Sequence, residues 1–141
     1  MADFNLHPRL AAGGYHLVTH QNCEVLLKNN AHYAWFVIVP RVDTEKTEIT
    51  DLTAAEYSDI NACTLAVSQF LELKFSPAKI NIGNIGNIVQ QMHIHVIGRT
   101  EKDPAWPEVV WGHPEKIPYS DKRVEEIKNT FKAFLAAKLD T

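Results

Sequence analysis

Two segments near the start of the chain have the apolar pattern of β-strands. CEVLLK (23–28) and YAWFVIVPR (33–41) are rich in β-branched and aromatic residues, and only the short segment NNAH separates them. This arrangement predicts a hairpin. Pro40 is expected to end the second strand, because proline has no N–H to donate to a neighbouring strand.

A helical pattern comes next. Thr53 and Glu56 have the spacing of a capping box, which predicts that a helix begins here. Apolar residues then recur at helical spacing at Tyr57, Ile60, Cys63, Val67, Phe70 and Leu71. Such a stripe indicates one helix face packed on a core. Pro77 marks the loop that follows.

The second half of the chain predicts two further strands and one helix. AKINIG (78–83) and VQQMHIHVIGR (89–99) are the strands, whereas 102–118 is too rich in proline and tryptophan for a regular element. A final helix is expected from near Ser120, with an apolar face made by Val124, Ile127, Phe131, Phe134 and Leu135. The order of elements predicts one α+β domain over residues 1–141, with a mostly antiparallel sheet.

Composition narrows the classes of function. The 141 residues carry a formal net charge of −3, which argues against non-specific binding to the phosphate backbone of nucleic acid. It does not exclude a small phosphorylated ligand. Two cysteines without a CxxC motif fit a reducing cytoplasm. No apolar leader is expected at the N-terminus, and the longest apolar run is far shorter than the ~20 residues that span a bilayer.

The stretch QQMHIHVIGR (90–99) contains the strongest candidate chemistry. In a strand, successive side chains point to opposite faces. One face would then carry Gln91, His93 and His95, and the core face would carry Met92, Ile94 and Val96. A row of two imidazoles and an amide is costly to bury without partners, so we expect it to face a cleft with a ligand.

Three interpretations of this row remain open. The row could be the solvent-exposed side of a half-buried strand, a metal site built on H-x-H, or a site for phosphate chemistry. The cupin metal pattern G-x5-H-x-H-x3,4-E fits poorly, because Asn87 stands at the glycine position and Glu101 comes one residue late. A neutral imidazole can attack phosphorus and form a covalent phosphoramidate, while a neighbouring donor stabilises the phosphoryl oxygens.

The segment INIGNIGN (80–87) favours the phosphate interpretation. Glycines let backbone N–H groups approach an anion closely, and asparagine amides add donors and acceptors. Asn81, Gly86 and Asn87 are the candidate phosphate-binding residues, although a plain turn before a strand is the alternative. The segment lacks GK[ST], so it is not a Walker loop.

At these residues the chain resembles the histidine triad (HIT) superfamily, whose motif is H-φ-H-φ-H-φ-φ. The matching segment is QMHIHVI (91–97), and GNIGNIVQQMHIHVIGR as a whole resembles the family's loop and motif strand. YAWFVIVPR resembles the family's strand ending in proline. DPAWPEVVWG and NLHPRLAA resemble a bacterial, diadenosine polyphosphate hydrolase-like branch in which the first triad position is often Gln.

The resemblance implies a fold and an activity. The fold is α+β, with a five-stranded antiparallel sheet and two main helices, usually in a homodimer. The activity is hydrolysis or transfer on dinucleoside polyphosphates such as diadenosine tetraphosphate, or on nucleoside phosphoramidates, through a nucleotidyl-histidine intermediate. No metal is expected to be held by the protein, and Mg²⁺ can arrive on a polyphosphate substrate.

The resemblance also implies roles for single residues. His93 is the nucleophile, His95 donates to the phosphate or the leaving group, and Asn87 contacts phosphate. Ile88 stands where many members have Ser or Thr, which removes one hydroxyl contact to phosphate. The ribose contact is expected at Asn29 or at Asn30, which follows it.

Gln91 departs from the family's pattern. An amide can accept and donate hydrogen bonds, but it does not titrate near neutral pH. We therefore expect retained covalent chemistry with an altered rate or leaving-group preference; the alternative is a nucleotide-binding homodimer with little or no catalysis. Trp106, in the tail, is expected to cover a cleft or a dimer edge, or to pack the tail on the sheet.

Overall fold

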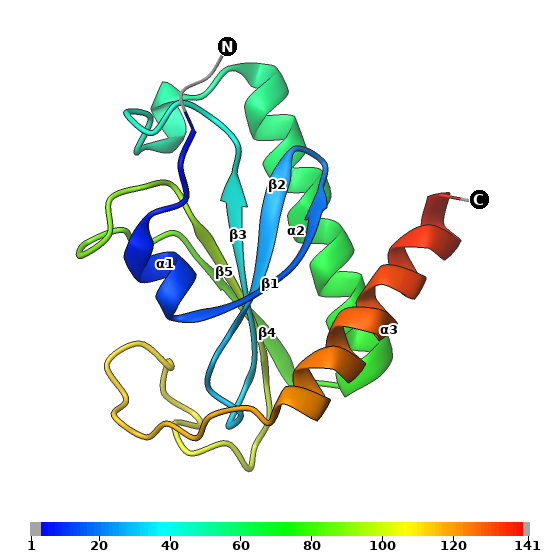
Figure 1. Cartoon of the computed structure of the whole chain (residues 1–141). Coiled ribbons are helices and arrows are strands. Elements are labelled where there is room, and N and C mark those ends of the chain that lie inside the picture. The colour runs from blue at the N-terminus through cyan, green and yellow to red at the C-terminus, as the bar shows by residue number, and fades with distance from the viewer. Residues whose placement is uncertain (1–3, 140–141) are drawn as a thin grey trace.

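The computed structural model describes residues 4–139 and contains a five-stranded antiparallel sheet with two long helices packed against it (Figure 1). The strands are β1 (Gly14–His20), β2 (Cys23–Lys28), β3 (Ala34–Pro40), β4 (Lys79–Gly83) and β5 (Ile94–Arg99). The helices are α1 (Pro8–Ala12), α2 (Ala54–Phe75) and α3 (Asp121–Leu139), with a 3-10 helix at Ile49–Asp51. Their spatial order, β1-β2-β3-β5-β4, confirms the predicted α+β class.

Strand β1 is the one strand that the apolar pattern did not predict, although the family resemblance implied a fifth strand; the short helix α1 and the 3-10 helix were not predicted either. It lies at an edge of the sheet and is mostly half-exposed, with only Leu17 buried. Its pairing with β2 also shifts between His16 and Val18, which breaks the strict alternation of side chains. An irregular edge strand therefore leaves a weak signal in the sequence.

The strand predicted over 89–99 is shorter than expected and begins at Ile94. Ile94 pairs with Ile38 of β3, so continued pairing would bring Met92 opposite Pro40. Proline cannot donate to a ladder, and β3 ends at this residue. His93 and Gln91 consequently lie in the segment just before β5, while His95 lies within it.

Helix α2 begins with the predicted capping box. The Thr53 hydroxyl accepts a hydrogen bond from the Glu56 N–H at 3.1 Å, and the Glu56 carboxylate accepts from the Thr53 N–H at 2.8 Å. The predicted stripe is buried except at Tyr57, which is 42% exposed, so its assignment to the core was wrong. At 3.6 residues per turn, Tyr57 lies about 90° around the helix from the centre of the buried stripe.

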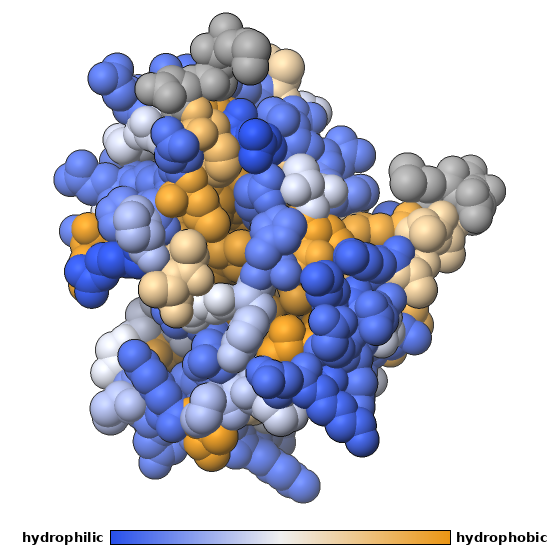
Figure 2. All heavy atoms as spheres, viewed as in Figure 1, coloured by the Kyte–Doolittle hydropathy of each residue, from blue (hydrophilic) through white to orange (hydrophobic). Residues whose placement is uncertain are grey.

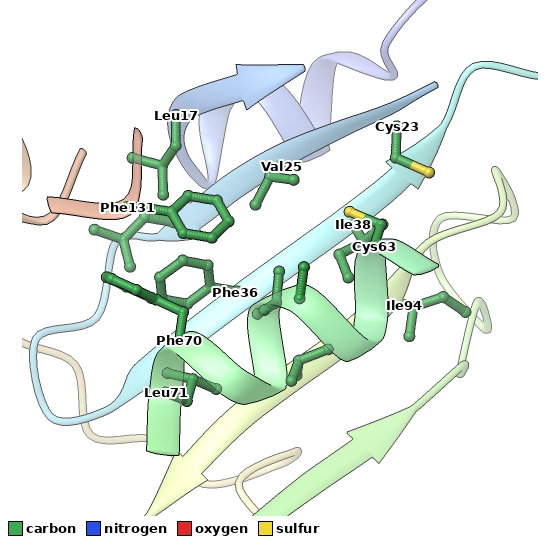
Figure 3. Packing of buried hydrophobic residues seen from close by; sticks show 14 of the residues in the cluster. Leu17, Cys23, Val25, Phe36, Ile38, Cys63, Phe70, Leu71, Ile94 and Phe131 are labelled. Atoms are coloured by element: carbon green, nitrogen blue, oxygen red, sulfur yellow. The ribbon is translucent and has the colours of Figure 1, made fainter. Parts of the chain in front are cut away.

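One face of the sheet, which we call the helix face, packs against α2 and α3. Its core includes an aromatic cluster in which Phe70 of α2 meets Phe131 of α3 at 4.8 Å and Phe36 of β3 at 5.9 Å between ring centroids (Figure 3). Met92, Ile94 and Val96 belong to this core, as the alternation predicted. The apolar face of α3 does too, with Phe134 packed at its margin.

The opposite face, which we call the loop face, is covered by segments with little regular structure. Its buried core joins side chains of β2, β3 and β5 to the tail that follows β5, and the N-terminal segment packs against it. The core residues are Leu26, Tyr33, Trp35, Val37, Val39, Ile97, Ala105 and Val110.

No helix within residues 4–139 is long and apolar enough to cross a bilayer, and hydrophilic residues cover most of the surface seen in Figure 2.

Candidate functional site

A cavity of about 690 Å³ opens on the loop face and is lined by both histidines of the motif. Pockets of roughly 300–1,000 Å³ hold small-molecule ligands in other proteins. Besides the motif segment with His93 and His95, four parts of the chain form its walls. They are α1 with the turn after it, strands β2 and β3, the Gly/Asn loop 85–89 and the tail 110–116.

The cavity favours an anion, although the chain as a whole is acidic. Arg9, Lys28 and Lys116 line it, and no carboxylate of the described residues does so. Cations concentrated in a cleft raise the local affinity for phosphate-bearing ligands. Within residues 4–139, no three His, Cys, Asp or Glu side chains are grouped so that they could hold a metal ion.

The ring of His93 is fixed by the backbone beside it. Its Nδ1 lies 2.7 Å from the carbonyl oxygen of Gln91. A carbonyl oxygen can only accept, so Nδ1 carries the proton and, in the neutral ring, Nε2 keeps its lone pair. Burial lowers the pKa of His93 below its ordinary 6.5. The hydrogen bond to the Gln91 carbonyl opposes this shift, and Lys28 and His7 add to it, so the neutral ring is favoured at physiological pH. A neutral imidazole with a bare Nε2 at a cationic cavity is a competent nucleophile.

The ring of His95 has the opposite arrangement. Its Nδ1 accepts a hydrogen bond from the indole N–H of Trp35 at 2.9 Å, so the ring proton is on Nε2. Burial, followed by the charges of His93 and Lys28, lowers the pKa of His95 to about 3. The two imidazole rings lie 4.9 Å apart between centroids. One phosphoryl group can therefore meet an acceptor nitrogen on one ring and a donor nitrogen on the next.

Gln91 does not line the cavity and instead holds the N-terminal segment. Its amide oxygen accepts from the N–H of His7, and its amide nitrogen donates to the carbonyl of Asn5, both at 2.8 Å. The side chain thus pairs with an extended segment much as a neighbouring strand would. This segment leads directly into α1, whose Arg9 lines the cavity.

Of the residues predicted to bind phosphate between positions 81 and 88, three line the cavity and one does not. Gly86, Asn87 and Ile88 line the cavity, and Gly86 has a φ of +69°, which favours glycine. Asn81 does not line it, because β4 continues to Gly83 and the Asn81 amide oxygen accepts from the Arg99 guanidinium at 2.8 Å.

Asn30 rather than Asn29 borders the cavity. Asn30 is buried, and its amide oxygen accepts from the His32 N–H at 3.2 Å while its nitrogen donates to the Glu115 carbonyl at 3.1 Å. The Asn29 amide oxygen accepts from the Tyr119 N–H at 2.8 Å, away from the cavity lining. Both side chains join the β2–β3 loop to the end of the tail.

The two tryptophans of the tail have different surroundings. Trp106 lies beside the guanidinium of Arg99, 5.6 Å from its ring centroid, and does not line the cavity. Arg99 is itself buried and forms a two-pronged ion pair with Asp103 at 2.8 and 2.9 Å, which fixes the start of the tail. Trp111 lines the cavity with its ring 5.5 Å from that of His95.

Lys28, Trp35 and Trp111 are among the cavity residues that sequence reasoning did not single out. The paired tryptophans of the tail were noted, but nothing in the pattern showed which one turns inward. Trp35 and Lys28 lie on predicted strands at positions that the apolar pattern assigns no chemistry. Their proximity to His95 depends on strand register, which a single sequence does not give.

Comparisons with known proteins agree with this geometry. A family model described as HIT domain matches residues 15–102. A histidine triad protein from Marinobacter aquaeolei VT8 is 34% identical, with 95% of this chain and 97% of that chain covered and a TM-score of 0.88. A histidine triad protein from Sinorhizobium meliloti 1021 is 32% identical, with 93% and 96% covered and a TM-score of 0.88. No curated protein matches the sequence.

Proposed function

The chain belongs to the HIT family, and on this premise we propose that it is a nucleotidyl-phosphate hydrolase or transferase. Proteins of this family typically bind nucleotides and act as hydrolases or transferases. The proposed substrates are dinucleoside polyphosphates or nucleoside phosphoramidates, and the proposed intermediate is a nucleotidyl-histidine. The observation that carries the proposal is the unprotonated Nε2 of His93 at a cavity lined by cations.

In the proposed first step, Nε2 of His93 attacks the α-phosphorus of the substrate. The bond from phosphorus to the leaving group breaks, and the leaving group takes the electron pair. The Nδ1 proton stays in its hydrogen bond to the Gln91 carbonyl. A water then attacks phosphorus, the P–N bond breaks with its electron pair returning to Nε2, and a nucleoside monophosphate and a proton are released.

Other cavity residues support charge on the transferring group. The Nε2–H of His95, the Asn87 amide and backbone N–H groups of the Gly86 loop are the proposed donors to phosphoryl oxygens. Lys28 adds positive charge. Asn30, rather than Asn29, is the residue proposed to contact the ribose. Mg²⁺ enters this scheme only as a partner of a polyphosphate substrate.

Intact-protein mass spectrometry tests the proposal. Wild type, His93→Ala and the control His32→Ala, which alters a histidine outside the cavity lining, are incubated briefly with diadenosine tetraphosphate and with an adenosine phosphoramidate. We expect an AMP-sized adduct and AMP release from wild type and His32→Ala, and neither from His93→Ala. An adduct that persists in His93→Ala would contradict the role of His93.

Binding of AMP without adduct or turnover in the wild type would support the alternative, a nucleotide-binding protein with little catalysis. The homodimer that the family resemblance implies and the cytoplasmic location that the cysteine usage suggests stay predictions. Sedimentation equilibrium of the full chain measures the first of these directly.

A further inference from the structure

The hydrogen bond between Trp35 and His95 is held from several sides. Val37 of β3 pairs with His95 of β5, and Trp35 pairs with Ile97, so Trp35 and His95 are diagonal neighbours on the loop face. Both side chains are buried. The Trp35 ring also meets the rings of Tyr33 and Trp111 edge to face, at 5.9 and 6.3 Å between centroids. The indole therefore has little freedom to turn its N–H away.

This contact limits what His95 can do with its proton. A second proton on Nδ1 would bring two N–H groups together at 2.9 Å, so the Trp35 contact opposes the imidazolium form. Burial lowers the pKa of His95 in the same direction. A neutral imidazole N–H donates a hydrogen bond readily, but giving up that proton would leave an imidazole anion. His95 is therefore placed to stabilise charge and not to deliver a proton.

We infer that Trp35 is a positioning residue that confines His95 to hydrogen-bond donation, and that the site consequently favours leaving groups that depart without gaining a proton. The inference rests on the proposed function. When the P–O bond of a phosphoanhydride breaks, the leaving phosphate carries the electron pair as a stable anion. When the P–N bond of a phosphoramidate breaks, the leaving nitrogen must gain a proton. The favoured substrate class is therefore the dinucleoside polyphosphates.

The other charged and titratable groups around His95 come from several elements. His93 and Lys28 face it most closely, and both act on its pKa. Arg9, His113 and Lys116 line the same cavity. Gln91, the residue at the first triad position, has an amide that does not titrate and that is bonded to the N-terminal segment. The competing route is proton delivery to the leaving group by Lys28 or His113. On that route, the wild-type kcat/KM for a phosphoramidate would depend on pH differently from what a non-titrating His95 predicts.

The test uses the ratio of kcat/KM for two substrates, so a loss of activity that affects both substrates equally does not change the ratio. For diadenosine tetraphosphate and an adenosine phosphoramidate, kcat/KM is measured between pH 5.5 and 8 in wild type, Trp35→Phe and Trp111→Phe. Trp35→Phe removes the indole N–H and keeps an aromatic ring. Trp111→Phe is the matched control, because it shortens the other indole against the His95 ring without removing a hydrogen bond to it.

We expect the ratio of phosphoramidate to polyphosphate kcat/KM to rise as the pH falls in Trp35→Phe, by about ten-fold relative to wild type. Burial and the neighbouring charges still oppose the imidazolium form, but the indole N–H no longer does, so a larger fraction of His95 can act as a general acid. Trp111→Phe should keep the wild-type ratio at each pH. An unchanged ratio in Trp35→Phe would overturn the inference. So would a wild-type ratio that already favours the phosphoramidate, since another group would then supply the proton.

Nitrogen NMR of the imidazole rings gives a second readout that requires no turnover. In wild type we expect His95 to carry its proton on Nε2 and to show no titration between pH 5.5 and 8, whereas in Trp35→Phe the fixed tautomer is lost and titration begins at a higher pH than in wild type. A proton on Nδ1 of His95 in the wild type would refute the tautomer, even if the variant fails to fold. A wild type that forms no adduct and releases no AMP would instead refute the proposed function and leave the tautomer to be judged by NMR alone.

Discussion

The two faces of the sheet bury different kinds of side chain. The helix face is apolar, and aromatic rings from α2, α3 and β3 fill it. The loop face buries His93, His95, Gln91, Arg99 and Asp103, each with a hydrogen-bond partner, beneath segments that have little regular structure. Stability on the first face comes from packing area, whereas the second depends on paired polar groups that are costly to leave unpaired.

Removing an aromatic ring from the helix face should have the largest effect. Phe70→Ala is expected to lower the free energy of unfolding by about 4 kcal/mol, because it leaves a cavity among packed rings. Urea denaturation measures the change. Since Phe70 packs in the helix-face core, on the other side of the sheet from the cavity, the tautomers of His93 and His95 should be retained below the transition. A shifted tautomer in folded Phe70→Ala would show that the two faces are coupled.

Acid should destabilise the loop face through His95. The pKa of His95 is lowered from 6.5 to about 3 in the folded protein, so its contribution is complete above pH 6.5 and is lost progressively as the pH falls toward 3. By pH 5 the loss amounts to about 2 kcal/mol. Glu24 and Asp103 also have lowered pKa values, but their losses begin nearer to 4.

Urea midpoints at pH 7 and pH 5 check this expectation. His95→Asn removes the titrating ring, so its stability should fall less between the two pH values than that of wild type. The remaining fall in the variant reports His93 and His20, whose pKa values are also lowered. An equal fall in wild type and variant would mean that His95 is protonated as easily in the folded chain as in the unfolded one.

The smallest global effect is expected at Gln91. Gln91→Ala removes two hydrogen bonds to the N-terminal segment and should cost about 1 kcal/mol. Its local effect should be larger, since the segment before α1 loses its partner and becomes more open to proteases. Limited proteolysis compares it with Gln90→Ala, which alters the exposed neighbour. Identical cleavage of the two variants would argue against this role of Gln91.

The same contrast explains how far sequence reasoning reached. The capping box and stripe predicted α2 because helix formation and packing repeat along the chain. His93, His95 and Asn87 were predicted as site residues, and the structure brings all three to the cavity. The hydrogen-bond partners of the Gln91 and His95 side chains were not predictable. They lie at least 84 residues from Gln91 and 60 residues from His95 along the chain, so these contacts depend on tertiary placement. Asn81 was assigned to phosphate with the Gly/Asn segment 80–87, although it also falls within the predicted strand 78–83, and the structure places it on that strand.

The position of β5 has a consequence for the order of folding. Strands β1, β2 and β3 follow one another along the chain and pair as neighbours, whereas β5 must be inserted between β3 and β4. The Trp35–His95 hydrogen bond spans 60 residues, so it cannot form until that long loop, which includes α2, has closed. A chain that has formed only the β1–β2–β3 meander has the indole but no imidazole beside it. The tautomer of His95 is thus set in the same event that completes the sheet, and partly folded chains do not possess it.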